Sequence, residues 1–115
     1  MAEKCAFWIP SYRHCLWQPA VDVYRSPRGW LVKCDLAGIR PEDIEVSLAD
    51  GRLIIAGERR DWSAARDYDV YSLEIVYARF ERVVELPYDR EGAQVQTDYC
   101  DGMLSILLTS NQDTS

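Results

Sequence analysis

Short runs of alternating apolar and polar residues cover most of this chain, and they predict β-strands rather than helices. The clearest case is residues 95–108, where two alternating runs flank the pair Asp101-Gly102. Both positions of such a pair tolerate positive φ, so this stretch predicts a tight hairpin. Asp50-Gly51 lies between two further alternating runs and predicts a second hairpin.

Turn signals divide the rest of the chain into about seven strands of similar length, with no convincing long helix. The expected fold class is therefore all-β, an antiparallel β-sandwich with a long loop after the fifth strand. The middle of one strand, Leu53-Ile54-Ile55, is expected to be buried on both faces. The expected strands cover residues 21–24, 30–36, 44–48, 52–58, 74–86, 95–100 and 103–108.

The long loop, residues 60–73, is charged and shows no sustained alternation, although a helical turn is possible around 63–65. A connection of this length is unusual in a compact β domain, and such loops are usually functional or mobile. The expected organisation is a short aromatic arm (1–17), one domain (18–109) and a short polar tail (110–115).

The composition favours a folded acidic protein, because 48% of the 115 residues are hydrophobic and the net charge is −6. Lys and Arg form no stripe, so no nucleic-acid partner is expected. No apolar run approaches the ~18 residues of a membrane span, so stable membrane insertion is not expected. The N-terminus lacks the apolar core of a leader peptide, which makes the cytoplasm the expected location.

Residues suited to catalysis are scarce: His14 is the single histidine, and no Gly-rich phosphate loop occurs. The chain is therefore expected to be neither an enzyme nor a cofactor-binding protein. Cys34 shares the strand parity of its apolar neighbours and is expected to be a small buried hydrophobe. Cys5, His14 and Cys15 lack an evident fourth zinc ligand, so no metal site is expected, and a reactive or intermolecularly pairing thiol is the alternative there.

The N-terminal arm is unusually aromatic for an irregular segment. Two interpretations remain open: the rings cover the sheet, or they form an apolar segment that contacts client proteins. The rings in question are Phe7, Trp8, Tyr12 and Trp17.

Six motifs follow one another between residues 17 and 108. They are Trp17-Gln18-Pro19 with Val21-Asp22-Val23-Tyr24, Asp35-Leu36-Ala37-Gly38-Ile39, Glu42-Asp43-Ile44-Glu45-Val46, the strand at 53–59, Phe80-Glu81-Arg82 ending at Leu86-Pro87, and the stretch from Thr97 to Leu104. In this order and spacing they resemble the small heat shock proteins of the Hsp20 or α-crystallin family, of bacterial type.

The chain departs from the family pattern at five positions. Ala37 replaces a proline, Ile75 an arginine and Ala78 a glycine, while Thr97 and Met103 stand in the signature for Ala and Val. These changes are tolerable in the same backbone, so the expected fold stands.

The resemblance implies an immunoglobulin-like sandwich, the α-crystallin domain, and an ATP-independent holdase. Such a chaperone binds partly unfolded client proteins and limits their aggregation. An alternative on the same fold is a protein-interaction module or co-chaperone without holdase activity, because a fold does not define a function.

The resemblance also implies a dimer, in which the long loop is exchanged between protomers and adds a strand to the partner's first strand. A prominent arginine of the family pairs with acids at the dimer interface or within the sandwich. The residues at the matching positions are Asp69, Val70 and Tyr71 in the loop, Val21, Val23 and Tyr24 in the first strand, and Arg82.

The family further has a groove that receives an I-x-I/V tail from a neighbouring protomer. The candidate groove residues are Val46, Leu48, Val95, Thr97 and Tyr99, chosen partly by strand parity. Residues 109–115 contain no I-x-I/V motif, so large tail-linked oligomers are not expected.

Overall fold

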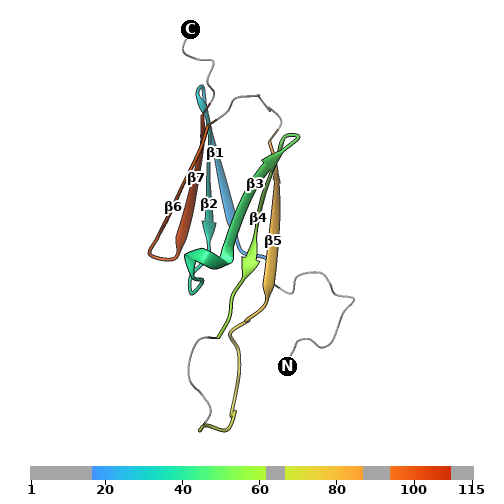
Figure 1. Ribbon diagram of the computed structural model, residues 1–115, viewed down its shortest axis with the longest axis vertical. Coiled ribbons are helices and arrows are strands. Elements are labelled where there is room, and N and C mark those ends of the chain that lie inside the picture. The colour runs from blue at the N-terminus through green and yellow to red at the C-terminus, as the bar shows by residue number, and fades with distance from the viewer. Residues whose placement is uncertain (1–16, 62–66, 87–93, 110–115) are drawn as a thin grey trace.

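The computed structural model describes residues 17–61, 67–86 and 94–109, which form a sandwich of two antiparallel sheets (Figure 1). One sheet has the strand order β1-β2-β7-β6, and the other has the order β3-β4-β5. The expected all-β sandwich is therefore confirmed. The elements are β1 (Val21–Ser26), β2 (Gly29–Asp35), the 3-10 helix η2 (Pro41–Asp43), β3 (Ile44–Ala49), β4 (Arg52–Glu58), β5 (Arg79–Glu85), β6 (Gln94–Cys100) and β7 (Met103–Thr109).

Two Asp-Gly pairs make the tight turns that the sequence predicts. Asp50 and Gly51 join β3 to β4 with φ of 54° and 74°, and Asp101 and Gly102 join β6 to β7 with φ of 54° and 80°. Positive φ at both central positions is the turn geometry whose twist matches the twist of the flanking strands. These turns set the register, so that each flanking pair of strands presents one set of alternate residues to the core.

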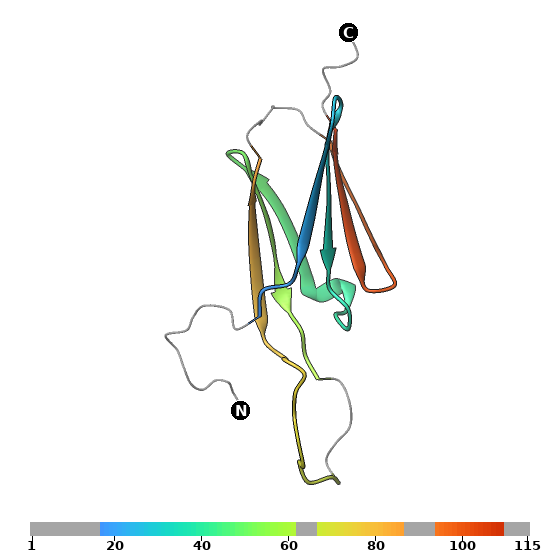
Figure 2. The same ribbon diagram turned by 180° about the vertical axis from the view of Figure 1, so that it is seen from behind.

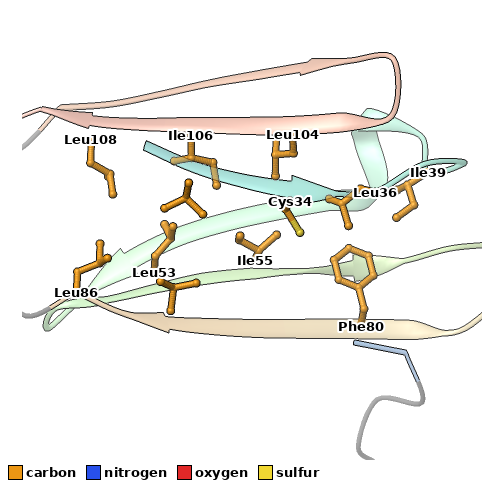
Figure 3. Close-up of a cluster of buried hydrophobic side chains, with 12 residues drawn as sticks. Cys34, Leu36, Ile39, Leu53, Ile55, Phe80, Leu86, Leu104, Ile106 and Leu108 are labelled. Carbon is orange, nitrogen blue, oxygen red and sulfur yellow. The ribbon is translucent and has the colours of Figure 1, made fainter. Parts of the chain in front are cut away.

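The hydrophobic core lies between the two sheets and is built from alternate residues of β2, β7, β4 and β5 (Figure 3). Cys34 is 0% exposed within it, which confirms the expectation that it is a small buried hydrophobe. Leu53 and Ile55 are fully buried, whereas Ile54 between them is half-buried. The other core residues are Val32, Leu36, Ile39, Phe80, Val84, Leu86, Leu104, Ile106 and Leu108.

The strand expected at 74–86 is shorter in the structure, because β5 begins only at Arg79. Its partner β4 ends at Glu58, which pairs with Arg79, and beyond that pair one further backbone bond runs from the Arg59 nitrogen to the Ala78 oxygen. Residues 74–78 therefore have no partner strand within the described chain. The long loop follows β4, the fourth described strand, and not a fifth one as expected.

Described residues 59–61 and 67–78 extend away from the sandwich on the side opposite the β1–β2 turn (Figures 1 and 2). The side chains from Tyr68 to Tyr77 include seven large hydrophobic ones that are exposed to solvent. Tyr71 is 100% exposed and Val70 is 72% exposed. This segment thus carries apolar surface that the sandwich does not cover.

We expect Gly102→Ala to destabilise the fold more than Gly38→Ala. Both glycines have positive φ, 80° and 82°, so each substitution carries a backbone strain of about 1 kcal/mol. A Cβ on Gly102 would also lie 2.9 Å from the Ala37 Cα, whereas a Cβ on Gly38 would meet only the Arg59 side chain at 3.6 Å. Urea unfolding of the two variants measures the difference. Equal losses would show that the turn at Gly102 can move away from Ala37.

Candidate functional site

A groove lies between β3 and β6, which are edge strands of the two different sheets. Its volume is about 320 Å³, and alternate residues of both strands point into it. The lining residues are Pro41, Ile44, Val46, Val95, Thr97, Tyr99 and Leu104. Apart from the Thr97 and Tyr99 hydroxyls, the lining side chains are apolar, which suits an extended peptide that buries alternate side chains.

The structure brings four of the five candidate groove residues together. Val46 comes from β3, and Val95, Thr97 and Tyr99 come from one face of β6. Leu48 does not line the groove; it packs against the core, because it pairs with Leu53 near the end of the β3–β4 hairpin.

Sequence reasoning missed three lining residues: Ile44, Leu104 and Pro41. Ile44 shares the strand parity of Val46, so alternation could have found it. Leu104 faces Tyr99 across the terminal hairpin, so the register set by the Asp-Gly turn could have found it. Pro41 begins η2, and no periodic signal marks its position.

The Tyr99 hydroxyl anchors one wall of the groove. Its oxygen lies 2.6 Å from the Leu36 carbonyl oxygen and 2.8 Å from that of Ile39. The hydroxyl has a single proton, so it donates to one carbonyl at a time or shares the proton between both. The bond ties β6 to the turn between β2 and η2 across sixty or more residues of sequence.

β1 presents the candidate first-strand residues at a sheet edge. One side of β1 pairs with β2, and no strand of the described chain pairs with its other side. Val23 is 44% exposed and Tyr24 47% exposed, while Val21 packs partly against the core. The edge can therefore accept a further strand.

The candidate loop residues Asp69, Val70 and Tyr71 form no strand in the described chain. They lie in the extended segment, away from β1 of the same protomer (Figure 2). The structure of one protomer therefore does not bring these two parts of the predicted dimer site together.

Arg82 lies on the inner face of β5, opposite Ile55 of β4, and it is half-buried. Its Nη1 donates to the Pro19 carbonyl oxygen at 2.9 Å. No acidic side chain forms a salt bridge with it among residues 17–61, 67–86 and 94–109. Among the described residues, then, the partner of Arg82 is a backbone carbonyl and not an acidic side chain.

Burial raises the pKa of the Cys34 thiol to about 11, although the nearby positive charge of Arg82 acts to lower it. The thiol is therefore protonated at neutral pH and poorly reactive. Cys100 on β6 is exposed.

Only Trp17 of the four arm candidates lies within the described residues; Phe7, Trp8 and Tyr12 lie outside them, as do Cys5, His14 and Cys15. The Trp17 ring packs edge-on against Phe80, with centroids 5.4 Å apart and planes at 74°. The Arg59 guanidinium carbon lies 3.8 Å from the Trp17 ring centroid. Trp17 thus covers one end of the core.

The described residues offer neither a metal-binding cluster nor a membrane-spanning helix. No group of three or more His, Cys, Asp or Glu side chains there could hold a metal ion. None of the helices in that part of the chain is long and apolar enough to span a bilayer.

Comparison with known families identifies the family of this chain. Residues 22–115 match the model of the Hsp20/alpha crystallin family. The chain belongs to this family. The expectation from the motifs at 17–108 is thereby confirmed, and the groove between β3 and β6 is a groove of an Hsp20 domain.

Relatives with this domain include spore protein SP21 of Stigmatella aurantiaca, which is 30% identical over 90 residues. The match covers 78% of this chain but 53% of SP21, so the chain spans about half the length of that relative. Small heat shock protein C4 of Rickettsia felis is 22% identical over 113 residues, which cover 97% of this chain and 69% of that protein.

Solved structures of similar proteins share the sandwich. A small heat-shock protein from Xylella fastidiosa is 32% identical, with a TM-score of 0.68 over 86% of this chain and 91% of that one. Heat shock protein 16.0 from Schizosaccharomyces pombe has a TM-score of 0.73 over 86% of this chain and 92% of that chain. At 22% identity, this second likeness concerns the fold alone.

We expect Tyr99→Phe to lower the free energy of unfolding by about 1–2 kcal/mol. The ring that lines the groove remains, but the Leu36 and Ile39 carbonyls lose their hydroxyl donor. Tyr24→Phe is the matched control, because no described residue hydrogen-bonds the Tyr24 hydroxyl and its side chain is half exposed. Thermal or urea unfolding measures both variants. Equal stability of the two would mean that the Tyr99 hydroxyl bonds contribute nothing net.

Proposed function

We propose that this Hsp20-family protein is an ATP-independent holdase, which binds partly unfolded proteins and limits their aggregation. The observation that carries the proposal is the apolar groove between two strand edges of different sheets. An unfolding protein exposes apolar side chains and unpaired strands. An open groove with a free strand edge on each side can cover both, through side-chain contacts and added backbone hydrogen bonds.

The exposed apolar segment from Tyr68 to Tyr77 supports the same proposal. Contiguous apolar surface on a soluble domain marks a contact site for another protein. The segment is also acidic, with Asp67, Asp69 and Glu74, which favours its solubility while it is uncovered.

A second candidate is an interaction module that binds folded partners or co-chaperones without protecting clients. The size of the groove favours it, because a volume of about 320 Å³ accommodates a few side chains of one short peptide and not a broad unfolded surface. The two functions differ in their effect on aggregation, so one assay separates them.

We expect the protein to suppress the heat-induced aggregation of a labile enzyme in the absence of ATP. Light scattering of the enzyme at several chaperone-to-enzyme ratios measures the effect. Val46→Asp with Thr97→Asp places charge in the groove and should weaken suppression at least about threefold, while Ser47→Asp on the opposite face of β3 serves as the control. Unchanged aggregation at every ratio would favour the interaction module.

We also propose that the protein dimerises by exchange of the long loop, with the segment around Asp69, Val70 and Tyr71 adding to the open edge of the partner's β1. Three observations support this pairing: the free edge of β1, the exposure of Val23 and Tyr24, and the exposed apolar loop. An extended segment that adds to a sheet edge gains both backbone hydrogen bonds and buried apolar area. In the proposed dimer, an acidic side chain of the partner protomer also contacts Arg82 of β5.

We expect Val70→Lys with Tyr71→Lys to convert a dimer into a monomer, because two charges would then have to be buried at the strand interface. Size-exclusion chromatography with light scattering measures the mass. Leu107→Lys is the control, since Leu107 is 39% exposed on the outer face of β7, away from the β1 edge. Loss of the dimer in the control alone, or an equal mass for all three proteins, would contradict loop exchange.

A further inference from the structure

Trp17 packs against Phe80 and Arg59 at the edge of β5, and this surface is called the Trp17 seat. We propose that the seat is a binding site for an extended peptide segment with an aromatic side chain. Trp17 of the same chain keeps this site closed. The proposal extends the holdase function, because it names the chemistry of the segment that an unfolding client presents. The seat lies at the edge of β5, whereas the groove lies between β3 and β6 and the loop of a partner would add to β1; Arg82 is the one residue shared with the proposed dimer contacts.

The seat is shaped for an aromatic ring. Phe80 offers its ring to the edge of the Trp17 ring at a centroid distance of 5.4 Å. Arg59 places its guanidinium carbon 3.8 Å from the Trp17 centroid, within cation–π distance. With Trp17 in place Phe80 is 1% exposed, so the seated ring shields the core at this end of the sandwich.

The backbone beside the ring is held along the edge of β5 (Figure 2). Trp17 forms a parallel bridge with Phe80, which adds a short strand-like segment to the three-stranded sheet. The Gln18 side chain donates to the Glu81 carbonyl at 3.3 Å, and Arg82 donates to the Pro19 carbonyl at 2.9 Å. The bridge and the Arg82 bond involve backbone of the guest segment, so any extended peptide can make them.

Of residues 17–19, only the aromatic ring of Trp17 is therefore recognised by side chains of the seat, namely Phe80 and Arg59. Gln18 uses its amide, but its target is a backbone oxygen of β5 that other donors can also reach. An aromatic residue in an unfolded segment meets the same two partners, Phe80 and Arg59. Unfolding proteins expose such residues from their cores.

Arg59 is held in position independently of Trp17. Its Nε donates to the Val76 carbonyl at 2.9 Å, and its Nη1 donates to the Ala37 carbonyl at 3.3 Å. Neither bond involves Trp17, so both would remain to orient the guanidinium when the ring leaves. A site organised before the ligand arrives binds it with a smaller ordering cost.

Trp17 closes the seat as a tethered competitor. A group attached to the same chain acts at an effective concentration in the millimolar range, so a free peptide competes poorly with it. The apparent affinity of the peptide equals its intrinsic affinity multiplied by the fraction of molecules in which the seat is open. Removal of the Trp17 ring should therefore raise the affinity for an aromatic peptide.

The test uses the full chain and a fluorescein-labelled peptide with the sequence of residues 14–20, in which Cys15→Ser prevents disulfide formation. Fluorescence anisotropy measures its dissociation constant. We expect Trp17→Ala to bind the peptide at least about tenfold more tightly than the unchanged protein. The same peptide with its tryptophan replaced by alanine should show no such gain.

Two further variants separate this site from the groove. Added to Trp17→Ala, Arg59→Gln should reverse most of the gain and Arg59→Lys only part of it, because lysine keeps the charge but not the flat stacking surface. Val46→Asp in the groove should leave the gain unchanged. Equal affinity with and without the Trp17 ring, or a gain that Val46→Asp abolishes and Arg59→Gln does not, would overturn the proposal.

A second measurement covers the case in which Trp17→Ala does not fold. In the unchanged protein labelled with 5-fluorotryptophan, Trp17→Phe identifies the Trp17 fluorine signal. Excess unlabelled peptide should displace Trp17 and shift that signal, while the alanine peptide should not; no shift at saturating peptide overturns the proposal. Neither measurement involves aggregation. The two proposals can therefore be contradicted separately: the protein could lack holdase activity and still bind the peptide at this site, or suppress aggregation without binding it.

Discussion

The structure depends on burying the inner faces of two short sheets against each other. Alternate residues of β2 and β7 meet those of β4 and β5, and this contact excludes water from twelve core side chains. The same arrangement leaves each sheet open, because a sandwich of four and three strands closes neither sheet into a barrel. β1, β6, β3 and β5 are therefore edge strands in the described chain.

Each proposed interaction uses one or two of these edges. β3 and β6 border the groove, β1 is the edge to which a partner's loop would add, and β5 carries the Trp17 segment. Exposed edges usually promote aggregation, and proteins commonly blunt them with charges or cover them. In this molecule the edges stand beside apolar side chains, which suits the contacts with other chains that are proposed above.

The strands of the sandwich could be predicted from sequence because local signals and the core demand the same structure. The two Asp-Gly pairs set both the positions of the turns and the registers that bury Ile55 and Leu104. The prediction failed where apolar residues have no partner within the chain. Residues 75–78 form an apolar run that leads directly into β5, but β4 ends before it reaches them.

The candidate sites were harder to predict because they depend on contacts between distant segments. Strand parity found most of the groove but wrongly included Leu48, since parity does not say how far along a strand the groove extends. Arg82 bonds the Pro19 carbonyl, which no motif indicates. The sequence marks Arg59 only as part of a motif, because its contacts to Trp17, Ala37 and Val76 lie between 17 and 42 residues away.

The turn at residues 36–39 joins the groove to the Trp17 seat through a single stretch of backbone. On one side the Leu36 and Ile39 carbonyls accept from Tyr99, and on the other the Ala37 carbonyl accepts from Arg59. Gly102 also packs on Ala37, so the terminal hairpin limits how this turn can move. Mutations in these four residues would therefore act on both proposed recognition surfaces at once, and the turn is constrained by both.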